Sequence, residues 1–131
     1  MTGNDTAWSA DDLARIDEHD EVRIASLRSD GTLTSDRIIW AVRLGDQVYV
    51  RSVNGPGAAW FRATRHRRAG ELRVGGMSKD IAILDVDHAD GIEDRIDAAY
   101  RAKYGRYSGP VASITTEQAR ATTLQLVPRP Q

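Results

Sequence analysis

A glycine-rich segment in the middle of the chain separates two stretches that carry arginine. Residues 53–57 read Val-Asn-Gly-Pro-Gly, which is too rich in chain breakers to continue a strand, and good helix formers follow from Ala58. A helix that begins after such a loop offers free backbone N–H groups and the positive end of its dipole to an anion. Arginine adds paired donors that suit phosphate oxygens. The pattern predicts a phosphate-binding loop, with Arg51 and Arg62 as its cationic candidates.

Two tryptophans near this loop could line a pocket for a planar ligand, because large aromatic side chains present flat apolar faces at low entropic cost. Trp40 is in phase with Ile38 and Val42 on a stretch with the period of a strand, so core packing is its commoner role. Trp60 follows the loop, and for it both roles stay open.

The expected helix after the loop carries a basic group that could attract a phosphorylated cofactor or nucleic acid. A solvated helix face is the ordinary explanation of such a group. Aromatic platforms for stacking bases are not interleaved with the charge, so we expect no nucleic-acid partner. The group consists of Arg62, Arg65, His66, Arg67 and Arg68.

Other residue types that do chemistry show no site pattern. His19, His66 and His88 are far apart, and no pair has the helical spacing of metal ligands. The acidic stretch 85–90 lacks the ordered ligand series of a calcium loop, and no serine lies in a nucleophile elbow. We therefore expect no metal, and we assign no catalytic acid or base.

Length and composition restrict the classes of protein that fit. With 131 residues the chain suits one domain, expected over 8–129 after a disordered tail at 1–7. The net charge of -1 gives no field that would draw it onto nucleic acid or an anionic membrane. Absence of cysteine excludes disulfides and fits a reducing compartment. Without a signal-peptide core or a long apolar run, we expect a cytoplasmic protein with no membrane partner.

Three helices are predicted from capping residues and from the helical spacing of apolar side chains. The third carries charged residues such as Glu93 on its outer side. A loop with Gly109 and Pro110 follows, and Thr116 then caps a short turn. The helices span Ser9 to about His19, 58–69 with a stop at Gly70, and 91–105.

About six short strands are predicted, and tight turns join most of them. Parallel neighbours would need a long crossover for each pair, so antiparallel pairing remains. Closing such a sheet into a barrel removes its exposed edges. The predicted fold class is therefore α+β, a small antiparallel β-barrel with three helices. The strands span 21–28 with a hairpin turn at 29–31 into 32–34, then 37–43, 47–52, 71–74, 79–86 and 122–127.

Three consecutive segments resemble the core of the FMN-binding and deazaflavin-dependent split β-barrels. They read Arg-Ile-Ile-Trp-Ala-Val at 37–42, Gly-Asp-Gln-Val-Tyr-Val-Arg-Ser at 45–52, and 55–62 with Trp-Phe-Arg at its end. A small bacterial family with a domain of unknown function, DUF2255, is more closely similar, over residues 8–129. That likeness adds Gly75-Gly76, Tyr100 to Gly105 and the ending Ala121 to Arg129.

The resemblance implies a homodimer that holds an FMN or deazaflavin ring between its subunits. The strand at 37–40 would run beside the ring, with Trp40 lining the pocket. Arg51, Ser52 and the start of the following helix would hold the phosphate. The residues expected to contact the cofactor are Trp40, Arg51, Ser52, Asn54, Trp60 and Arg62.

The implied function is an oxidoreductase, similar to nitroreductases and quinone reductases, that acts on a small conjugated molecule. Many flavin-binding members have a lysine soon after the glycine loop, where this chain reads Ala58-Ala59-Trp60. This departure motivates an alternative: a cofactor-free small-ligand-binding protein, or a non-redox enzyme that acts on a hydrophobic metabolite. A purely structural or regulatory dimer is a third possibility.

Overall fold

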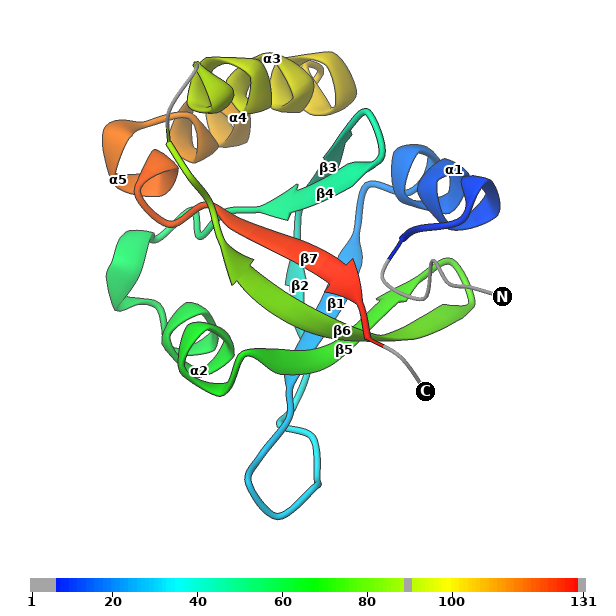
Figure 1. Ribbon diagram of the computed structural model, residues 1–131. Helices are drawn as coiled ribbons and strands as arrows, with labels where there is room; N and C mark the ends of the chain where they lie inside the picture. Colours follow the sequence, from blue (N-terminus) through cyan, green and yellow to red (C-terminus); the bar gives the residue numbers. More distant parts are fainter. Residues whose placement is uncertain (1–6, 89–90, 130–131) are drawn as a thin grey trace.

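Seven strands form one antiparallel sheet that curls into a barrel, with helices around it (Figure 1). The computed structural model describes residues 7–88 and 91–129, so the tail expected at 1–7 lies, except for Ala7, outside the described residues. The predicted α+β antiparallel barrel is confirmed, although the described residues form seven strands and five α-helices. The strands are β1 (Val22–Ser26), β2 (Arg37–Ile39), β3 (Ala41–Leu44), β4 (Gln47–Val50), β5 (Ala69–Val74), β6 (Met77–Asp85) and β7 (Leu124–Pro128). The helices are α1 (Ala10–Glu18), the 3-10 turn η1 (Gly55–Gly57), α2 (Ala59–Arg67), α3 (Ile92–Tyr104), α4 (Ser108–Ile114) and α5 (Glu117–Arg120).

The two ends of the sheet are consecutive in the chain, and Trp40 joins them. The strand order is β2-β1-β5-β6-β7-β4-β3, and all neighbours are antiparallel. β2 ends at Ile39 and β3 begins at Ala41, yet β2 pairs with β1 whereas β3 pairs with β4. The prediction of one strand over 37–43 is therefore wrong, because Trp40 turns the chain from one end of the sheet to the other. The barrel is split beside this corner.

Strand β4 separates two hydrophobic cores, because its side chains alternate between the faces of the sheet. Val48 and Val50 belong to the core inside the barrel, together with Leu126 from β7. Tyr49 belongs to an outer core between the sheet and the helices α3 and α4. The alternation expected over 47–52 is confirmed for 47–50, where β4 ends.

Helices α3 and α4 cover the outer side of β3 and β4 (Figure 1). On α3, Ile96, Tyr100 and Tyr104 follow one another at intervals of four residues and have no exposed area. Side chains four apart lie on the same face of a helix, which explains the single buried stripe. This outer core fixes α3 against the strand that follows Trp40.

Two expectations about glycine are wrong. Arg68, not Gly70, ends α2, in the left-handed conformation with φ 64°. Gly70 lies in β5, where a Cβ would be 2.1 Å from the carbonyl oxygen of Ala25, so close approach of β1 requires glycine. Gly109 and Pro110 are not in a loop but in the first turn of α4. Proline is tolerated there because its missing N–H would have no acceptor within the helix.

Predictions about local turns and caps are confirmed in part. Ser9 and Thr116 cap α1 and α5 with their side-chain oxygens, as expected. A hairpin with its second strand at 32–34 was expected after the turn at 29–31. Residues 32–34 instead form no strand, and Leu27 and Leu33 make an isolated bridge. The strand that pairs with β1 beyond this turn is β2.

Candidate functional site

A cleft of about 720 Å³ opens at the split of the barrel. Its walls are the segment 37–40, the segment 51–54 after β4, the start of α2 at 58–60, and α4 with Pro110 and Ile114. Small-molecule sites commonly have volumes of about 300–1,000 Å³. The cleft is therefore large enough for one ligand of cofactor size.

Trp40 is held at the edge of the cleft by α3. Its ring is parallel to that of Tyr104, with 3.9 Å between centroids and 7° between planes. Tyr100 Oη donates a hydrogen bond to the carbonyl oxygen of Trp40 at 3.0 Å. Burial raises the pKa of both tyrosines, because a phenolate would lose its hydration, so both hydroxyls remain donors. Trp40 thus combines the two roles considered for it: it packs against the outer core and it lines the cleft.

The start of α2 lines the cleft. Its N-cap, Ala58, has no side chain that could accept a hydrogen bond. Within the described part of the chain, the backbone N–H groups of Ala59, Trp60 and Phe61 have no acceptor, whereas Arg62 N donates to Ala58 O. Free N–H groups at a helix start attract anions, and the helix dipole adds to this attraction. The uncapped helix start expected after the glycine loop is therefore present.

Ser52 and Gly55 fix the loop that leads to this helix. Ser52 N donates to Thr122 Oγ1 at 2.8 Å, and Ser52 Oγ donates to Gly55 O at 2.7 Å. Gly55 has φ +79°, and a Cβ there would meet the side chain of Gln118 at 2.0 Å. Only glycine adopts this conformation without strain in this position. Ser52 is fully buried, so it shapes the loop from behind the cleft.

Arg51 is a buried structural cation. Its side chain has no exposed area, and all five of its guanidinium N–H groups donate to protein acceptors. The acceptors are Thr123 Oγ1 (2.9 Å), Asp97 Oδ1 (2.5 Å), Ile114 O (3.1 Å), Glu93 Oε1 (2.7 Å) and Glu93 O (3.1 Å). One side chain thereby connects the end of β4 to α3, α4 and the segment before β7.

This network changes the role that we expected for Arg51. A guanidinium has five N–H donors, so none is left for a ligand phosphate. Glu93, expected on the outer side of its helix, is instead buried, because Arg51 and His88 both pair with its carboxylate. Any anion in the cleft has to be bound by other groups.

Arg37 supplies an uncommitted positive charge at the rim of the cleft. Its side chain is exposed and has no ion pair or hydrogen bond among residues 7–88 and 91–129. The neighbouring Asp36 is already neutralised, since its carboxylate lies 3.1 Å from Arg23 Nη1 and 3.8 Å from Arg73 Nη1. Arg37 and the uncapped start of α2 therefore line the same cleft.

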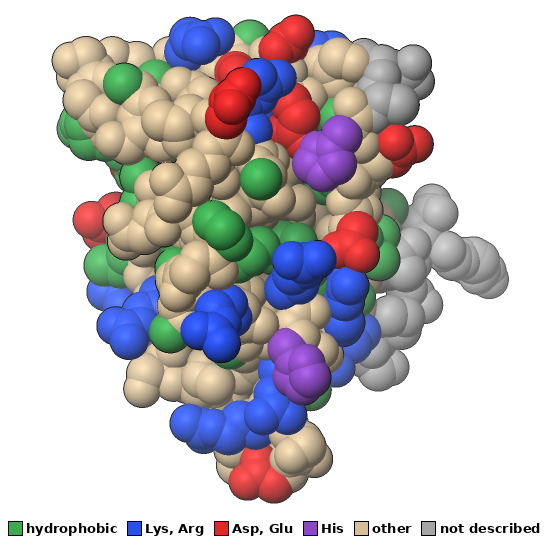
Figure 2. Space-filling model, turned by 90° about the vertical axis from the view of Figure 1, so that its left-hand side faces the viewer, with side chains coloured by type: hydrophobic (Ala, Val, Ile, Leu, Met, Phe, Trp, Pro, Cys, Tyr) green, Lys and Arg blue, Asp and Glu red, His purple; other side chains and the backbone are tan. Residues whose placement is uncertain are grey.

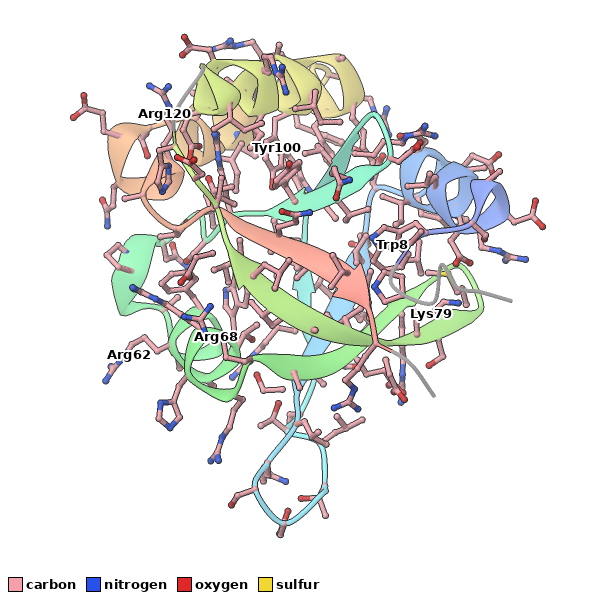
Figure 3. The ribbon with its side chains drawn as sticks, in the orientation of Figure 1. Trp8, Arg62, Arg68, Lys79, Tyr100 and Arg120 are labelled. Atoms are coloured by element: carbon pink, nitrogen blue, oxygen red, sulfur yellow. The ribbon has the colours of Figure 1, made fainter. Side chains whose placement is uncertain are left out.

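The structure brings four of the six predicted site residues to the cleft. They are Trp40, Arg51, Asn54 and Trp60. Ser52 lies behind the loop, as described above. Arg62 points away from the barrel and lines a separate depression on α2 (Figure 3). Contact of Trp40, Asn54 and Trp60 with a cofactor remains a prediction.

Sequence reasoning missed two parts of the cleft. Pro110 and Ile114 line it from α4, a segment for which only a loop was expected. Whether the guanidinium of Arg37 finds a partner depends on the side chains of the strand that pairs with β2, and the local pattern does not specify that strand.

One signal for the role of Arg51 was present in the sequence. Glu93 and Asp97 are four residues apart and lie on the core side of α3, and such a pair signals a buried cation nearby.

The described residues limit what else the site can contain. In residues 7–88 and 91–129, no three metal-ligating side chains come together. Over the same ranges, none of the helices has both the length and the apolar character needed to cross a bilayer. Among the residues that line the cleft, Arg37 has no ion-pair partner in the described part of the chain, and Ala59 and Trp60 belong to the uncapped helix start.

Solved structures of other proteins share this fold at low sequence identity. The heme storage protein HutZ from Vibrio cholerae has a TM-score of 0.62 at 9% identity, with 93% of this chain and 89% of HutZ covered. A FAD-binding protein from Mesorhizobium loti has a TM-score of 0.58 at 14% identity, with 95% and 92% covered. An F420 reductase has a TM-score of 0.50 at 20% identity, with 85% and 86% covered. The shared fold is the split barrel.

No curated protein sequence matches the chain. The profile of one bacterial family, described as an uncharacterized protein conserved in bacteria, matches residues 12–126. This range contains every wall of the cleft. The chain therefore belongs to the bacterial family DUF2255.

Proposed function

We propose that the cleft at the barrel split binds the ring of a flavin or deazaflavin, and that the protein is an oxidoreductase acting on a small conjugated molecule. One observation carries the proposal: a cleft of about 720 Å³ combines apolar and aromatic walls with the uncapped start of α2. The likeness in fold to a FAD-binding protein and to an F420 reductase supports it.

The walls fit a planar, largely apolar ring. Trp40 and Trp60 offer aromatic faces, and Ile38 and Val53 add apolar side chains that are 49% and 47% exposed. Covering such surface stabilises a complex by roughly 25 cal/mol per Å² of apolar area removed from water. A ring in the cleft would thus be held mainly by these four side chains.

The anionic end of the same ligand also finds suitable groups. Arg37 offers a free guanidinium, and Ala59 and Trp60, whose N–H groups have no acceptor among the described residues, line the cleft. Charge-assisted hydrogen bonds of this kind are about twice as strong as those between neutral groups. We assign phosphate binding to Arg37 and the start of α2, in place of Arg51.

A bound flavin or deazaflavin would supply hydride transfer, and the protein would supply binding, orientation and exclusion of water. Asp36, the carboxylate in the cleft lining, is paired with two arginines. We therefore assign no residue of this chain as an acid or base. The described lining residues of the cleft include no His, Cys or Met, the side chains that commonly bind a heme iron, so this lining suits a flavin-type ring better.

We further propose that two copies of the chain form the functional unit. Ile38 and Val53 are large apolar residues at the mouth of the cleft, and both are about half exposed. A second copy seated over this mouth would cover them and would close the cleft around its ligand. The proposal agrees with the homodimer that the sequence resemblance implies.

A second candidate function needs no phosphate-binding cation, and the commitment of the Arg51 guanidinium to protein acceptors supports it. Because that guanidinium is fully committed and Ala58-Ala59-Trp60 contains no lysine, the cleft has few cations for a phosphate. A cofactor-free protein that binds or converts a hydrophobic metabolite would need none. Absorbance and mass spectra of the protein as purified separate the two functions. A yellow chromophore supports the first, whereas a colourless protein that carries an unrelated metabolite supports the second.

A further inference from the structure

A second depression, of about 380 Å³, lies on α2 and shares no lining residue with the cleft. Pro56 and the buried Phe61 contribute its apolar part. Figure 2 shows Lys and Arg side chains gathered over the lower half of this face of the molecule, with few acidic side chains among them. Three arginines and a histidine line the rest of the depression: Arg62, Arg65, His66 and Arg68.

The charge of this depression is only partly neutralised. Residues 58–70 contain four arginines and no acidic residue, although the whole chain has a net charge of -1. Arg68 Nη2 lies 2.9 Å from Asp85 Oδ2, and this hydrogen bond lowers the pKa of Asp85, with the charge of Arg65 adding to the effect. Arg62 and Arg65 form no ion pair among residues 7–88 and 91–129. Two guanidinium groups therefore remain available to a ligand.

The spacing of these groups suggests the ligand. Arg62, Arg65 and His66 stand at positions i, i+3 and i+4, which are neighbours about 5–6 Å apart on a helix surface. Each guanidinium can bind one phosphoryl group through two donors. We propose that the depression binds a small anion with two linked phosphoryl groups, independently of any ligand in the cleft.

The surroundings favour a small anion over larger partners. Phe61 is only 2% exposed, so the depression lacks a platform on which a nucleic-acid base could stack. The large exposed apolar side chains of the described residues lie elsewhere, so a lipid surface would find no anchor here. A free diphosphate needs only the guanidinium groups.

The test is a titration of nitrogen-15-labelled protein with inorganic pyrophosphate at constant ionic strength, followed by amide chemical shifts. We compare the unchanged chain with Arg62→Gln/Arg65→Gln and with a control that removes two exposed arginines of α3, Arg95→Gln/Arg101→Gln. We expect saturable shifts in residues 61–68, affinity about tenfold lower in the first variant, and a change below about twofold in the control.

Four results would overturn the proposal. Shifts that do not saturate, or an equal loss of affinity in both variants, would mean that the anion only screens surface charge. Shifts centred on residues 54–59 would place the anion in the cleft. Tighter binding of a single-stranded oligonucleotide than of pyrophosphate, lost in Arg62→Gln/Arg65→Gln, would assign the surface to nucleic acid. Because the pyrophosphate titration involves no flavin, its outcome does not depend on the function proposed for the cleft.

Discussion

The indole ring of Trp40 lies parallel to the phenol ring of Tyr104, with 3.9 Å between the ring centroids. Tyr104 is fixed in turn, because its hydroxyl donates to the carbonyl oxygen of Asp20 at 2.7 Å. Trp40 also joins the two ends of the sheet and lines the cleft. The outer core therefore supports the corner at which the barrel is split.

Replacing Arg51 by methionine should destabilise the fold strongly. The change removes the buried cation that Glu93 and Asp97 share, and breaking a buried ion pair in this way costs about 3–5 kcal/mol. Urea unfolding measures the loss. Arg43→Gln is the control, since Arg43 pairs with the half-exposed Asp17 and should cost less than about 1 kcal/mol. A cost for Arg51→Met no larger than that of the control would rule out the structural role of Arg51.

Replacing Arg37 by glutamine should weaken the binding of phosphate-bearing rings. Hydrogen bonds to charged groups contribute about 1.5–3 kcal/mol, so the affinity for FMN should fall about tenfold or more. Riboflavin has the same ring without the phosphate, and its affinity should stay within about twofold. Fluorescence titrations of both ligands measure the two effects. If FMN and riboflavin lose affinity equally, Arg37 does not bind the phosphate.

Lys103 should titrate near pH 8, well below an ordinary lysine. Burial lowers its pKa from 10.5 to about 8, an effect that the nearby Asp17 and Asp20 partly oppose. Its Nζ donates to Ile16 O and Ala41 O at 2.5 and 2.8 Å. The chain has only two lysines, so the carbon-13 signal of Lys103 Cε can be followed beside that of Lys79. A titration midpoint above pH 10 would contradict the predicted pKa.

The same shift predicts how stability depends on pH. Between pH 8 and 10.5 the unfolded chain binds more protons at Lys103 than the folded chain does. The free energy of unfolding should therefore rise with pH across this window, relative to a Lys103→Met variant. Urea unfolding of both proteins at the two ends of the window measures this difference, and a difference that falls with pH would reverse the assignment.

The exposed Ile38 should lie in a dimer interface. Ile38→Glu places a charge at the mouth of the cleft, and burying an unpaired charge is costly. Light scattering after gel filtration should give twice the chain mass of 14.4 kDa for the unchanged protein and the single mass for the variant. Leu84→Glu is the control, because Leu84 is also exposed but does not line the cleft. A single mass for the unchanged protein would exclude the dimer.

Local patterns in the sequence were sufficient to predict much of the fold. The alternation at 47–52 predicts both faces of β4, since side-chain direction in a strand depends only on position. Ser9 and Thr116 predict helix starts because a cap bonds within its own turn. These predictions involve neighbours in the sequence.

Two features that depend on specific distant partners were not predicted. The stretch 37–43 alternates like one strand, and only pairing with β1 and β4 shows that Trp40 divides it. Arg51 has the pattern of a ligand-binding residue, but its acceptors on Asp97 and Thr123 lie 46 and 72 residues further along the chain. Whether a charge is buried and paired depends on such contacts, which the local pattern does not contain.

The most direct test of the cleft is an equilibrium titration of the purified protein with FMN and with F420, followed by the absorbance and fluorescence of the ring. Trp40→Leu removes an aromatic face from the cleft, whereas Tyr107→Leu removes a ring that contacts Trp40 but does not line the cleft. We predict saturable binding of at least one of the two rings. Its affinity should be about tenfold lower in Trp40→Leu and within about twofold in Tyr107→Leu. No saturable spectral change with either ring, or binding that Trp40→Leu leaves unchanged, would contradict the assignment of the cleft as a flavin-type site.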